Sequence, residues 1–307
     1  MRIGLFRLLC IAFFILGCVR TEKNLAQDVP DSLKVDDQEF RRLLRKSREL
    51  NEDQKTRAKR TVNPRVLRKL AGDENESVRF YVASNRYAPY ETLVALASDE
   101  SPSVRWAVAV NDSLPAEVMP ALAGDTDIVV RMGLAANLHT TTDVLARLAE
   151  DILPVRRRAA SNPNMNPPVL ADLARDADTQ VRQAVARNVS TPPQSLGALA
   201  RDTVEVVKVA VAGNANTPPG ALTVLATDTS FVARQKVAGN GNTPKLMLMQ
   251  LAADSMVVVR RAVSVNVNTP KKTLEKLSYD PDKDISQMAR GRLAKILRKE
   301  IEEDLER

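Results

Sequence analysis

The segment from Val181 to Asp202 reads VRQAVARNVSTPPQSLGALARD and contains the features that decide the fold of this chain. Arg182 is followed after six residues by Asn188, then by a Thr-Pro pair and two leucines, and Asp202 lies 14 residues beyond the asparagine. The asparagine, its basic residue and its aspartate recur along the chain. The intervals are 26, 26, 25, 26, 26, 26 and 26 residues, between Asn85, Asn111, Asn137, Asn162, Asn188, Asn214, Asn240 and Asn266. Such regular spacing is typical of a repeat protein.

Each repeat is predicted to hold two short helices. After Thr191, two leucines and an alanine share one helical face, and a second apolar stretch at helical spacing runs from Val206 to Val211. The threonine before each proline is expected to accept a hydrogen bond from a free N–H at the start of the first helix. Asn214 is expected to end the second helix in a left-handed turn.

Neither helix exceeds the ~12 residues that an isolated helix needs for stability, so the repeats must stabilise one another by stacking. The predicted fold is all-α, a solenoid of about eight 26-residue two-helix repeats over residues 63–280, whose function is a surface. Two apolar columns would run through it. One contains Leu93, Met119, Leu145, Leu170, Leu196, Leu222, Leu248 and Leu274, and the other Leu96, Leu122, Leu148, Leu173, Leu199, Leu225, Leu251 and Leu277.

The motif from Val181 to Asp202 resembles the leucine-rich repeat variant family, and the resemblance extends over about residues 63–290. The Asp-x-x-x-x-Val-Arg segments, such as Asp99 to Arg105, are similar to HEAT repeats. Both resemblances imply a right-handed superhelix of stacked helices, often used to bind other macromolecules. A prototype of the first family carries an iron-sulfur cluster on N-terminal cysteines. This chain lacks such a set, so no cofactor is expected.

Residues 1–17 have the three parts of an export signal: two arginines, an apolar run from Leu8 to Leu16, and a small residue before Cys18. The apolar run is shorter than the ~20 residues of a membrane-spanning helix. Ile15-Leu16-Gly17-Cys18 resembles the lipobox of bacterial lipoproteins, which implies cleavage before Cys18 and lipidation of that residue. Val19 in place of aspartate implies sorting to the outer membrane, facing the periplasm. An uncleaved anchor and a cytosolic protein are the alternatives.

Residues 18–62 are predicted to form a lipidated tether and a charged helix over Asp37 to Arg60 that lies against the first repeat. The basic residues of this helix form either a solvated face or a contact with anionic lipid headgroups. Residues 281–307 are predicted to form a capping helix over the end of the core. Its buried face would contain Ile285, Met288, Ala289, Leu293, Ile296 and Leu297.

Two polar columns have both a structural and a functional interpretation. Each basic residue of the repeat follows an aspartate by six residues, or by five for Arg156, which favours ion pairs that tie turns together over a positive stripe for a polyanion. The asparagines are similarly expected to bond to adjacent turns rather than to a ligand.

The best candidates for partner binding are residues that the repeat does not fix. Aromatic side chains anchor interfaces, and five of them lie close together in the sequence, although they could instead cover the core of the first repeats. A run of three arginines adds positive charge, with Arg187 and Arg261 on the same side, and a solvated face is the alternative. The candidates are Phe80, Tyr81, Tyr87, Tyr90, Trp106, Arg156, Arg157 and Arg158.

No catalytic or metal-binding residue is predicted, because His139 is the only histidine and the chain has two cysteines, one in the signal and one assigned to lipid. The predicted function is therefore a non-enzymatic, lipid-anchored scaffold of the bacterial cell envelope that binds a protein or peptide. One alternative is an anionic envelope polymer or nucleic acid, suggested by the formal charge of +7, although nucleic acid is the less expected partner. Another is an enzyme on a HEAT-like frame.

Overall fold

The computed structural model describes residues 37–305, and the chain divides into two units after Gln54. Helix α2 (Asp37–Arg60) has the predicted bounds and contributes its first turns to the unit that ends at Gln54. The second unit, Lys55–Arg307, holds the last turns of α2 and all the repeats. The regular elements within residues 37–305 are helices, and the chain is an all-α solenoid as predicted.

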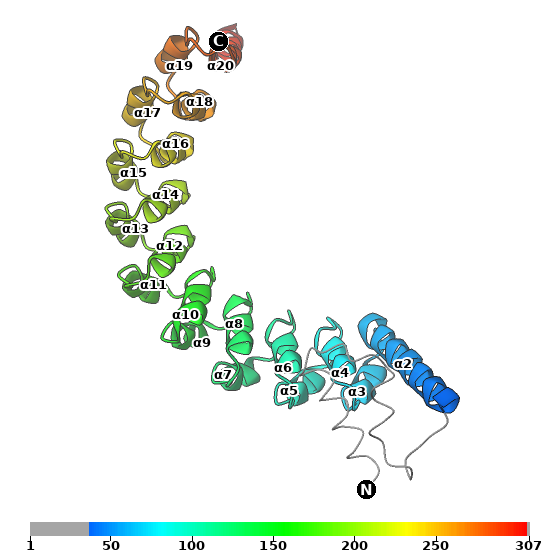
Figure 1. Cartoon of the computed structure of the whole chain (residues 1–307). Coiled ribbons are helices and arrows are strands. Elements are labelled where there is room, and N and C mark those ends of the chain that lie inside the picture. The colour runs from blue at the N-terminus through cyan, green and yellow to red at the C-terminus, as the bar shows by residue number, and fades with distance from the viewer. Residues whose placement is uncertain (1–36, 306–307) are drawn as a thin grey trace. The chain divides into compact units, whose positions relative to one another are not determined.

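The repeats place their helices in two rows, which Figure 1 shows side by side. Consecutive helices of the second row pack against one another along the stack. The first row contains α3 (Pro64–Leu70), α5 (Tyr90–Leu96), η2 (Ala116–Val118) with α7 (Met119–Leu122), α9 (Thr142–Leu148), α11 (Pro167–Leu173), α13 (Pro193–Leu199), α15 (Pro219–Leu225), α17 (Lys245–Leu251) and α19 (Lys271–Leu277). The second row contains α4 (Glu76–Ala83), α6 (Pro102–Ala109), α8 (Ile128–Ala136), α10 (Leu153–Ala160), α12 (Thr179–Arg187), α14 (Glu205–Gly213), α16 (Phe231–Gly239), α18 (Val257–Val265) and α20 (Lys283–Leu305).

The core lies between the two rows and is continuous along the stack. Both predicted columns are confirmed, because every leucine in them and Met119 is at most 8% exposed. In α14 the buried residues are Val207, Ala210 and Val211, whereas Val206, which the apolar pattern placed in the core, is 47% exposed. The helix begins only at Glu205, so Val206 lies in its first turn on the outward face.

The first-row helices do not begin as predicted. Thr191 makes no capping bond to the helix that follows it; instead its hydroxyl donates to the carbonyl of Val185 at 2.6 Å. A residue before proline is held in extended conformations, so the helix starts after Pro192 and the threonine lies outside it. The hydroxyl is then a second donor to a carbonyl in the last turn of the preceding second-row helix, which also accepts the N–H of Asn188 at 3.0 Å. The same bond is made by Thr140, Thr217, Thr243 and Thr269.

The asparagines also differ from the prediction in conformation. Asn188 ends α12 with φ −68° and ψ 128°, which is extended rather than left-handed. Its amide donates to the carbonyls of Ala160 at 2.8 Å and Asn162 at 2.7 Å in the preceding repeat, and its oxygen accepts from the N–H of Ser190. Ala160 is the last residue of α10, so its carbonyl is one that the helix leaves free. The predicted role in bonding adjacent turns is confirmed, and the left-handed turn is wrong because the next repeat caps this end.

Helix ends close the array at both termini of the second unit. Ala58, in the last turn of α2, is fully buried and its carbonyl accepts the amide of Asn85 at 2.8 Å. At the other end Arg292 lies 26 residues after Asn266, and its Nη1 donates to the carbonyl of Ser264 at 2.8 Å, as the asparagines do in earlier repeats. Burial lowers the pKa of Arg292.

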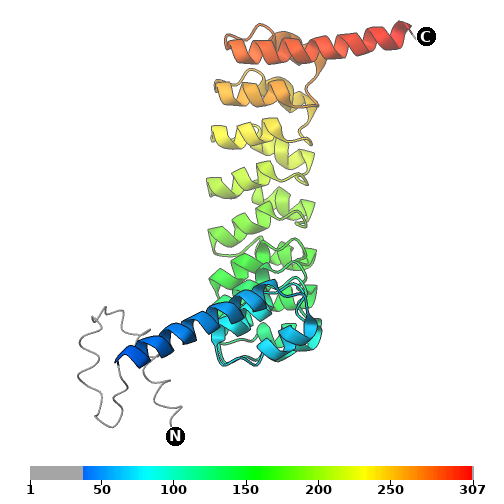
Figure 2. The same cartoon turned by 90° about the vertical axis from the view of Figure 1, so that its right-hand side faces the viewer.

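The buried face of α20 is narrower than the sequence predicted. Ile285 and Ala289 are fully buried, and Leu293 and Ile296 pack against the core. Met288 and Leu297, however, are each 39% exposed. Helix α20 lies against α18 and α19 and has no further repeat on its other side within the described chain, so only the stripe that points at those two helices is covered. Figure 2 shows α20 extending past the last repeat.

Candidate partner-binding surface

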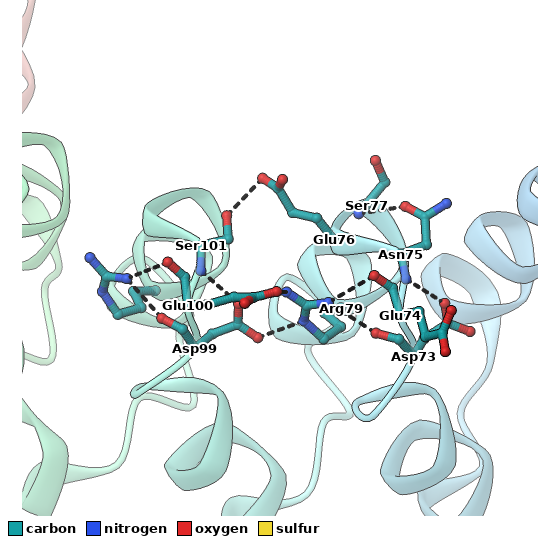
Figure 3. Close-up of polar contacts among 10 residues, drawn as sticks. Asp73, Glu74, Asn75, Glu76, Ser77, Arg79, Asp99, Glu100 and Ser101 are labelled. Atoms are coloured by element: carbon teal, nitrogen blue, oxygen red, sulfur yellow. Dashed lines mark hydrogen bonds and ion pairs between the residues drawn. The ribbon is translucent and has the colours of Figure 1, made fainter. Parts of the chain in front are cut away.

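The basic residues of the repeat link one Asp turn to the next. Arg79 donates from Nε to Asp99 Oδ2 at 2.6 Å and from Nη2 to Asp99 Oδ1 at 2.9 Å, and its Nη1 donates to the carbonyls of Asp73 and Glu74 (Figure 3). Asp99 also accepts the N–H of Ser101. The prediction that the carboxylate six residues earlier is the partner is wrong, because the cation binds that turn only through carbonyls. Its carboxylate partner lies 20 residues later.

This ladder has a structural role, as predicted. Apart from Arg156, the side chains of its cations are 10–18% exposed and those of its aspartates 4–15% exposed, so the ladder is no free positive stripe. The pairs are Arg79–Asp99, Arg105–Asp125, Arg131–Asp151, Arg156–Asp176, Arg182–Asp202, Lys208–Asp228, Arg234–Asp254 and Arg260–Asp280.

Arg156 was a candidate for partner binding, and the structure places it in the ladder. Its Nε lies 2.7 Å from Asp176 Oδ2 but makes no aligned hydrogen bond, and its side chain is 27% exposed. The turn before Arg156 is one residue shorter than in other repeats. Asp151 therefore accepts the N–H of the next residue, Ile152, whereas the other ladder aspartates accept the N–H two residues on, as Asp99 does from Ser101. We infer that this shortened turn alters the angle at which Arg156 meets its partner, making this the weakest pair of the ladder.

The ladder predicts a dependence of stability on acid. Seven aspartates of the ladder have a pKa below the ordinary value. In five of them burial is the largest single influence and raises the pKa, but hydrogen bonds from the paired cation and from a loop N–H together lower it by more. A carboxylate with a lowered pKa in the folded state stabilises the fold above its unfolded pKa of ~3.9. We expect the free energy of unfolding, measured with urea, to fall as the pH drops below about 4 and on through the folded pKa values. A flat profile there would contradict the ladder. The seven are Asp99, Asp125, Asp202, Asp228 and Asp254, and, with the arginine bond as the largest influence, Asp151 and Asp280.

The outward side of the second row differs from the rest of the chain in charge. In each second-row helix, the outward side is formed by four residues whose positions are counted from the ladder cation. They are the residue two positions before the cation and the residues one, two and five positions after it. We call these residues, taken together from α4 to α18, the second-helix face. None of them is Asp or Glu, although the chain has 38 acidic residues. The outward side of the first row, by contrast, contains exposed acids such as Glu91, Glu117, Asp143 and Asp172.

Three of the five candidate aromatic residues lie together on the second-helix face. Phe80 on α4 stacks on Trp106 on α6, with ring centroids 6.2 Å apart and planes at 5°, and Tyr81 meets Phe80 edge-on at 5.6 Å. Lys59 Nζ lies 5.8 Å from the centroid of the Tyr81 ring. All three rings are half-buried and pack against the core, so they both cover the first repeats and present an edge to solvent.

Gly133 on α8 makes room for the indole of Trp106. A Cβ at this position would lie 2.8 Å from Trp106 Cδ1 and 3.0 Å from Nε1. Gly133→Ala is therefore expected to lower the free energy of unfolding by about 1–3 kcal/mol and to shift the emission of the only tryptophan in the chain. Gly197→Ala in α13 is the control, since a Cβ there would have no atom within 4 Å and helix propensity predicts a gain of about 1 kcal/mol. Equal effects of the two substitutions would contradict this packing.

The other two aromatic candidates lie elsewhere. Tyr87 belongs to an asparagine turn, is 51% exposed and has the guanidinium of Arg86 5.3 Å from its ring centroid. Tyr90 begins α5 in the first row and is also 51% exposed; a hydrogen bond with Glu117 raises its pKa. The five lie close together in the sequence, but these two belong to a turn and to a first-row helix and so lie outside the cluster on α4 and α6.

Positive side chains follow the aromatic cluster along the second-helix face. Arg157 and Arg158 on α10 are exposed as predicted, and Arg157 donates to Gln180 on α12. Arg187 on α12 is exposed on the same face. Lys236 on α16, which the sequence analysis did not single out, also lies there and could have been found from its offset of two from Arg234. Arg261 on α18 is at this face too, but pairs with Asp282 and Asp284.

The remaining candidate residues for chemistry are accounted for as follows. His139 is exposed in an asparagine turn, where its N–H donates to Asn137. Residues 37–305 contain no group of three or more His, Cys, Asp and Glu side chains placed to bind a metal ion. No helix in this range is both long and apolar enough to cross a membrane. Cys18 and the signal segment lie outside the described residues, so their roles stay predictions.

A shallow groove of about 820 Å³ follows the asparagine turns of three repeats and is lined in part by prolines, among them Pro192 and Pro218. Its amides are already used inside the protein, since Asn216 donates to the carbonyl of Val189 and Asn242 to that of Ala215. The second-helix face is therefore the stronger candidate surface.

Comparison with known proteins identifies one repeat directly. The family model of the leucine rich repeat variant matches residues 179–203, from the start of α12 to the turn before α14. The predicted resemblance is confirmed there, and the chain is a helical-repeat solenoid. No curated protein matches the chain.

Three solved structures illustrate what the chain is similar to. One is described as a leucine-rich repeat variant with a novel repetitive protein structural motif; it is 26% identical, with 75% of this chain and 82% of that chain covered and a TM-score of 0.46. An engineered protein is 17% identical, with coverage of 79% and 93% and a TM-score of 0.42. A designed armadillo repeat protein in complex with the peptide (KR)4 is 14% identical, with coverage of 75% and 98% and a TM-score of 0.25.

Proposed function

We propose that this helical-repeat scaffold holds a protein or peptide on its second-helix face while a lipid on Cys18 anchors it in the bacterial cell envelope, at the outer membrane facing the periplasm. The observation that carries the proposal is the difference between the polar residues that bond one repeat to the next and those that lie on the second-helix face. The ladder cations and the asparagines are consumed by contacts between repeats, whereas the second-helix face holds residues that those contacts leave free. The proposed role is binding without catalysis, since stacked repeats typically serve as extended binding surfaces.

The two rows offer matched positions for a test in intact cells. Gln183 and Gln235 lie on the second-helix face, and Gln194 and Gln250 lie on exposed positions of the first row. A photo-crosslinking amino acid placed at Gln183 or Gln235 is expected to capture a discrete protein adduct, and the same group at Gln194 or Gln250 is not. Adducts from the first-row positions alone would refute binding through the second-helix face.

The lipid anchor has its own test, supported by the lipobox-like Ile15-Leu16-Gly17-Cys18. Cys18→Ser is expected to release the protein from membranes, whereas Cys10→Ser, which changes the other cysteine of the chain within the signal, is expected to leave it membrane-bound. Fractionation after a high-salt wash distinguishes the two. Membrane retention of the Cys18→Ser protein would contradict lipid anchoring.

A further inference from the structure

We propose that the second-helix face binds an extended acidic segment of a partner protein, in which an apolar side chain lies about six residues from a group of carboxylates. The inference rests on the proposed function and names the chemistry of its partner. It is carried by charge complementarity and by the order of side chains along the second row.

The second-helix face lacks negative charge. Without a single carboxylate from α4 to α18, it has no internal partner for the cations that it carries on α10, α12 and α16. Glu76 and Glu205, at the first positions of α4 and α14, accept hydrogen bonds from Ser101 and Ser230 of the following turns. They are oriented along the Asp turns. At the C-terminal end of the face, Asp282 and Asp284 pair with Arg261. An incoming carboxylate therefore meets cations without like-charge repulsion at this face.

The cations of α10 and α12 provide the site for the carboxylates. Arg158 on α10 and Arg187 on α12 are exposed, and within residues 37–305 neither is paired with an acidic side chain. Arg157 lies beside them and donates to Gln180. These three guanidinium groups come from adjacent helices that pack together, so they can bind two or three carboxylates of one segment.

The stacking of the helices sets the spacing between the apolar and the basic parts of the face. The apolar part is the edge of Trp106 on α6 with Met132 and the 53%-exposed Val129 on α8. From α6 to α10 there are two helix-to-helix steps of about 8–10 Å each, or about 20 Å in total. An extended chain covers ~3.3 Å per residue, so an apolar side chain over Trp106 lies about six residues from carboxylates at Arg158.

The same observations favour a peptide over a phosphate polymer. The affinity of a protein for a nucleic acid comes mainly from basic side chains that neutralise phosphates along the backbone. Here the cations are a group of three on α10 and α12, Lys236 two second-row helices further on, and Arg261 on α18, which already pairs with Asp282 and Asp284. Exposed Val206 and half-buried Val209 lie between the group of three and Lys236. Alternating apolar and basic side chains match a polypeptide with mixed side chains better than a uniformly charged chain.

The test uses the full chain and dye-labelled synthetic peptides at ~0.15 M salt, where distant surface charges are screened. One peptide carries a tryptophan about six residues from a run of glutamates; in a second the two are adjacent, and in a third serine replaces tryptophan. We expect the first to bind at least several-fold more tightly than the others by fluorescence anisotropy. Polyphosphate and single-stranded DNA serve as competitors.

Charge reversals supply the protein control. Arg158→Glu with Arg187→Glu is expected to weaken binding of the first peptide about tenfold or more. Arg175→Glu with Arg201→Glu makes the same change in net charge at exposed turns after α11 and α13 and should leave binding unchanged. Both pairs are exposed, so the melting temperatures should match that of the unaltered chain.

The outcomes separate this inference from the proposed function. Three results would overturn the acidic-segment proposal. They are an equal loss of peptide affinity in both double variants, no preference for the peptide with the spaced tryptophan, and stronger, steeply salt-dependent binding of polyphosphate or DNA. If Gln183 still captured a protein whose crosslinked segment is not acidic, the inference would fail while the proposed function stood. Absence of any adduct at Gln183 and Gln235 would remove the proposed function itself.

Discussion

Asn214→Ala is expected to lower the free energy of unfolding by about 3 kcal/mol. The amide of Asn214 donates to the carbonyls of Ala186 and Asn188, both at 2.9 Å, and its oxygen accepts the N–H of Asn216 at 2.8 Å. The side chain is buried, so alanine would leave the carbonyl of Ala186 and the N–H of Asn216 without these partners, at about 1–3 kcal/mol for each group that water does not reach; the carbonyl of Asn188 keeps the N–H of Thr191. Urea denaturation of the full chain measures the loss.

A matched control lies two residues away in the same turn. Asn216 is exposed, and its amide makes one bond, to the carbonyl of Val189 at 2.6 Å. Water can replace that bond, so Asn216→Ala is expected to cost about 0.5 kcal/mol or less. If the two alanine variants unfolded at the same urea concentration, the asparagine column would not have the stabilising role assigned to it.

Asp202→Ala is expected to cost about 3 kcal/mol, for a different reason. Asp202 Oδ2 accepts Nε of Arg182 at 2.7 Å and Oδ1 accepts Nη2 at 3.2 Å, and the two side chains are 7% and 15% exposed. Removing the carboxylate leaves a largely buried guanidinium without its hydrogen-bonded counter-charge, which is worse than the loss of an exposed ion pair. The N–H of Val204 loses its acceptor as well.

Asp176→Ala provides the comparison for this prediction. Asp176 accepts an equivalent loop N–H, from Asp178 at 2.8 Å, but its cation is Arg156, which is 27% exposed and lacks an aligned Nε bond. We expect its substitution to cost about half as much as that of Asp202. A larger loss for Asp176 than for Asp202, measured by thermal or urea unfolding, would argue against the bidentate bond as the source of ladder stability.

Much of the fold could be predicted because its signals repeat. The spacing of the asparagines defined the repeat, and the two leucine columns defined the buried side of the first-row helices, since a helix that covers a core must place apolar residues on one face. The bounds of α2 followed from the helical spacing of a few apolar residues within a charged stretch. Val206 was misassigned because an apolar residue in a first turn has the same pattern whether it faces the core or solvent.

The local bonding of the turns could not be predicted, because each group has several partners within reach of the chain. Arg182 lies six residues from Asp176 in sequence, yet its carboxylate partner is Asp202 in the next repeat. Thr191 could cap its own helix or the preceding one, and it caps the preceding one. For Arg182 the choice depends on the stacking of the repeats, because Asp202 comes within reach only when the next repeat lies against this one.

The candidate surface was found only in part. Phe80, Tyr81, Trp106, Arg157 and Arg158 were predicted and lie on the second-helix face, whereas Arg156 belongs to the ladder and Tyr87 and Tyr90 lie elsewhere. Lys236 was overlooked because it lies outside the aromatic group and the run of three arginines that the sequence analysis singled out. Lys236 lies two residues after the ladder cation Arg234, and this spacing on the helix places it on the second-helix face.

The sequence by itself determined the period, the helical content and the apolar columns of this protein, because each depends on residues a few positions apart along one helix. The tertiary structure alone decided which cation meets which carboxylate, which carbonyl each asparagine caps, and which side chains share the carboxylate-free face. Those contacts join residues about 20 to 28 positions apart, as in Arg182 to Asp202 and Asn214 to Ala186, and they exist only once one repeat lies against the next.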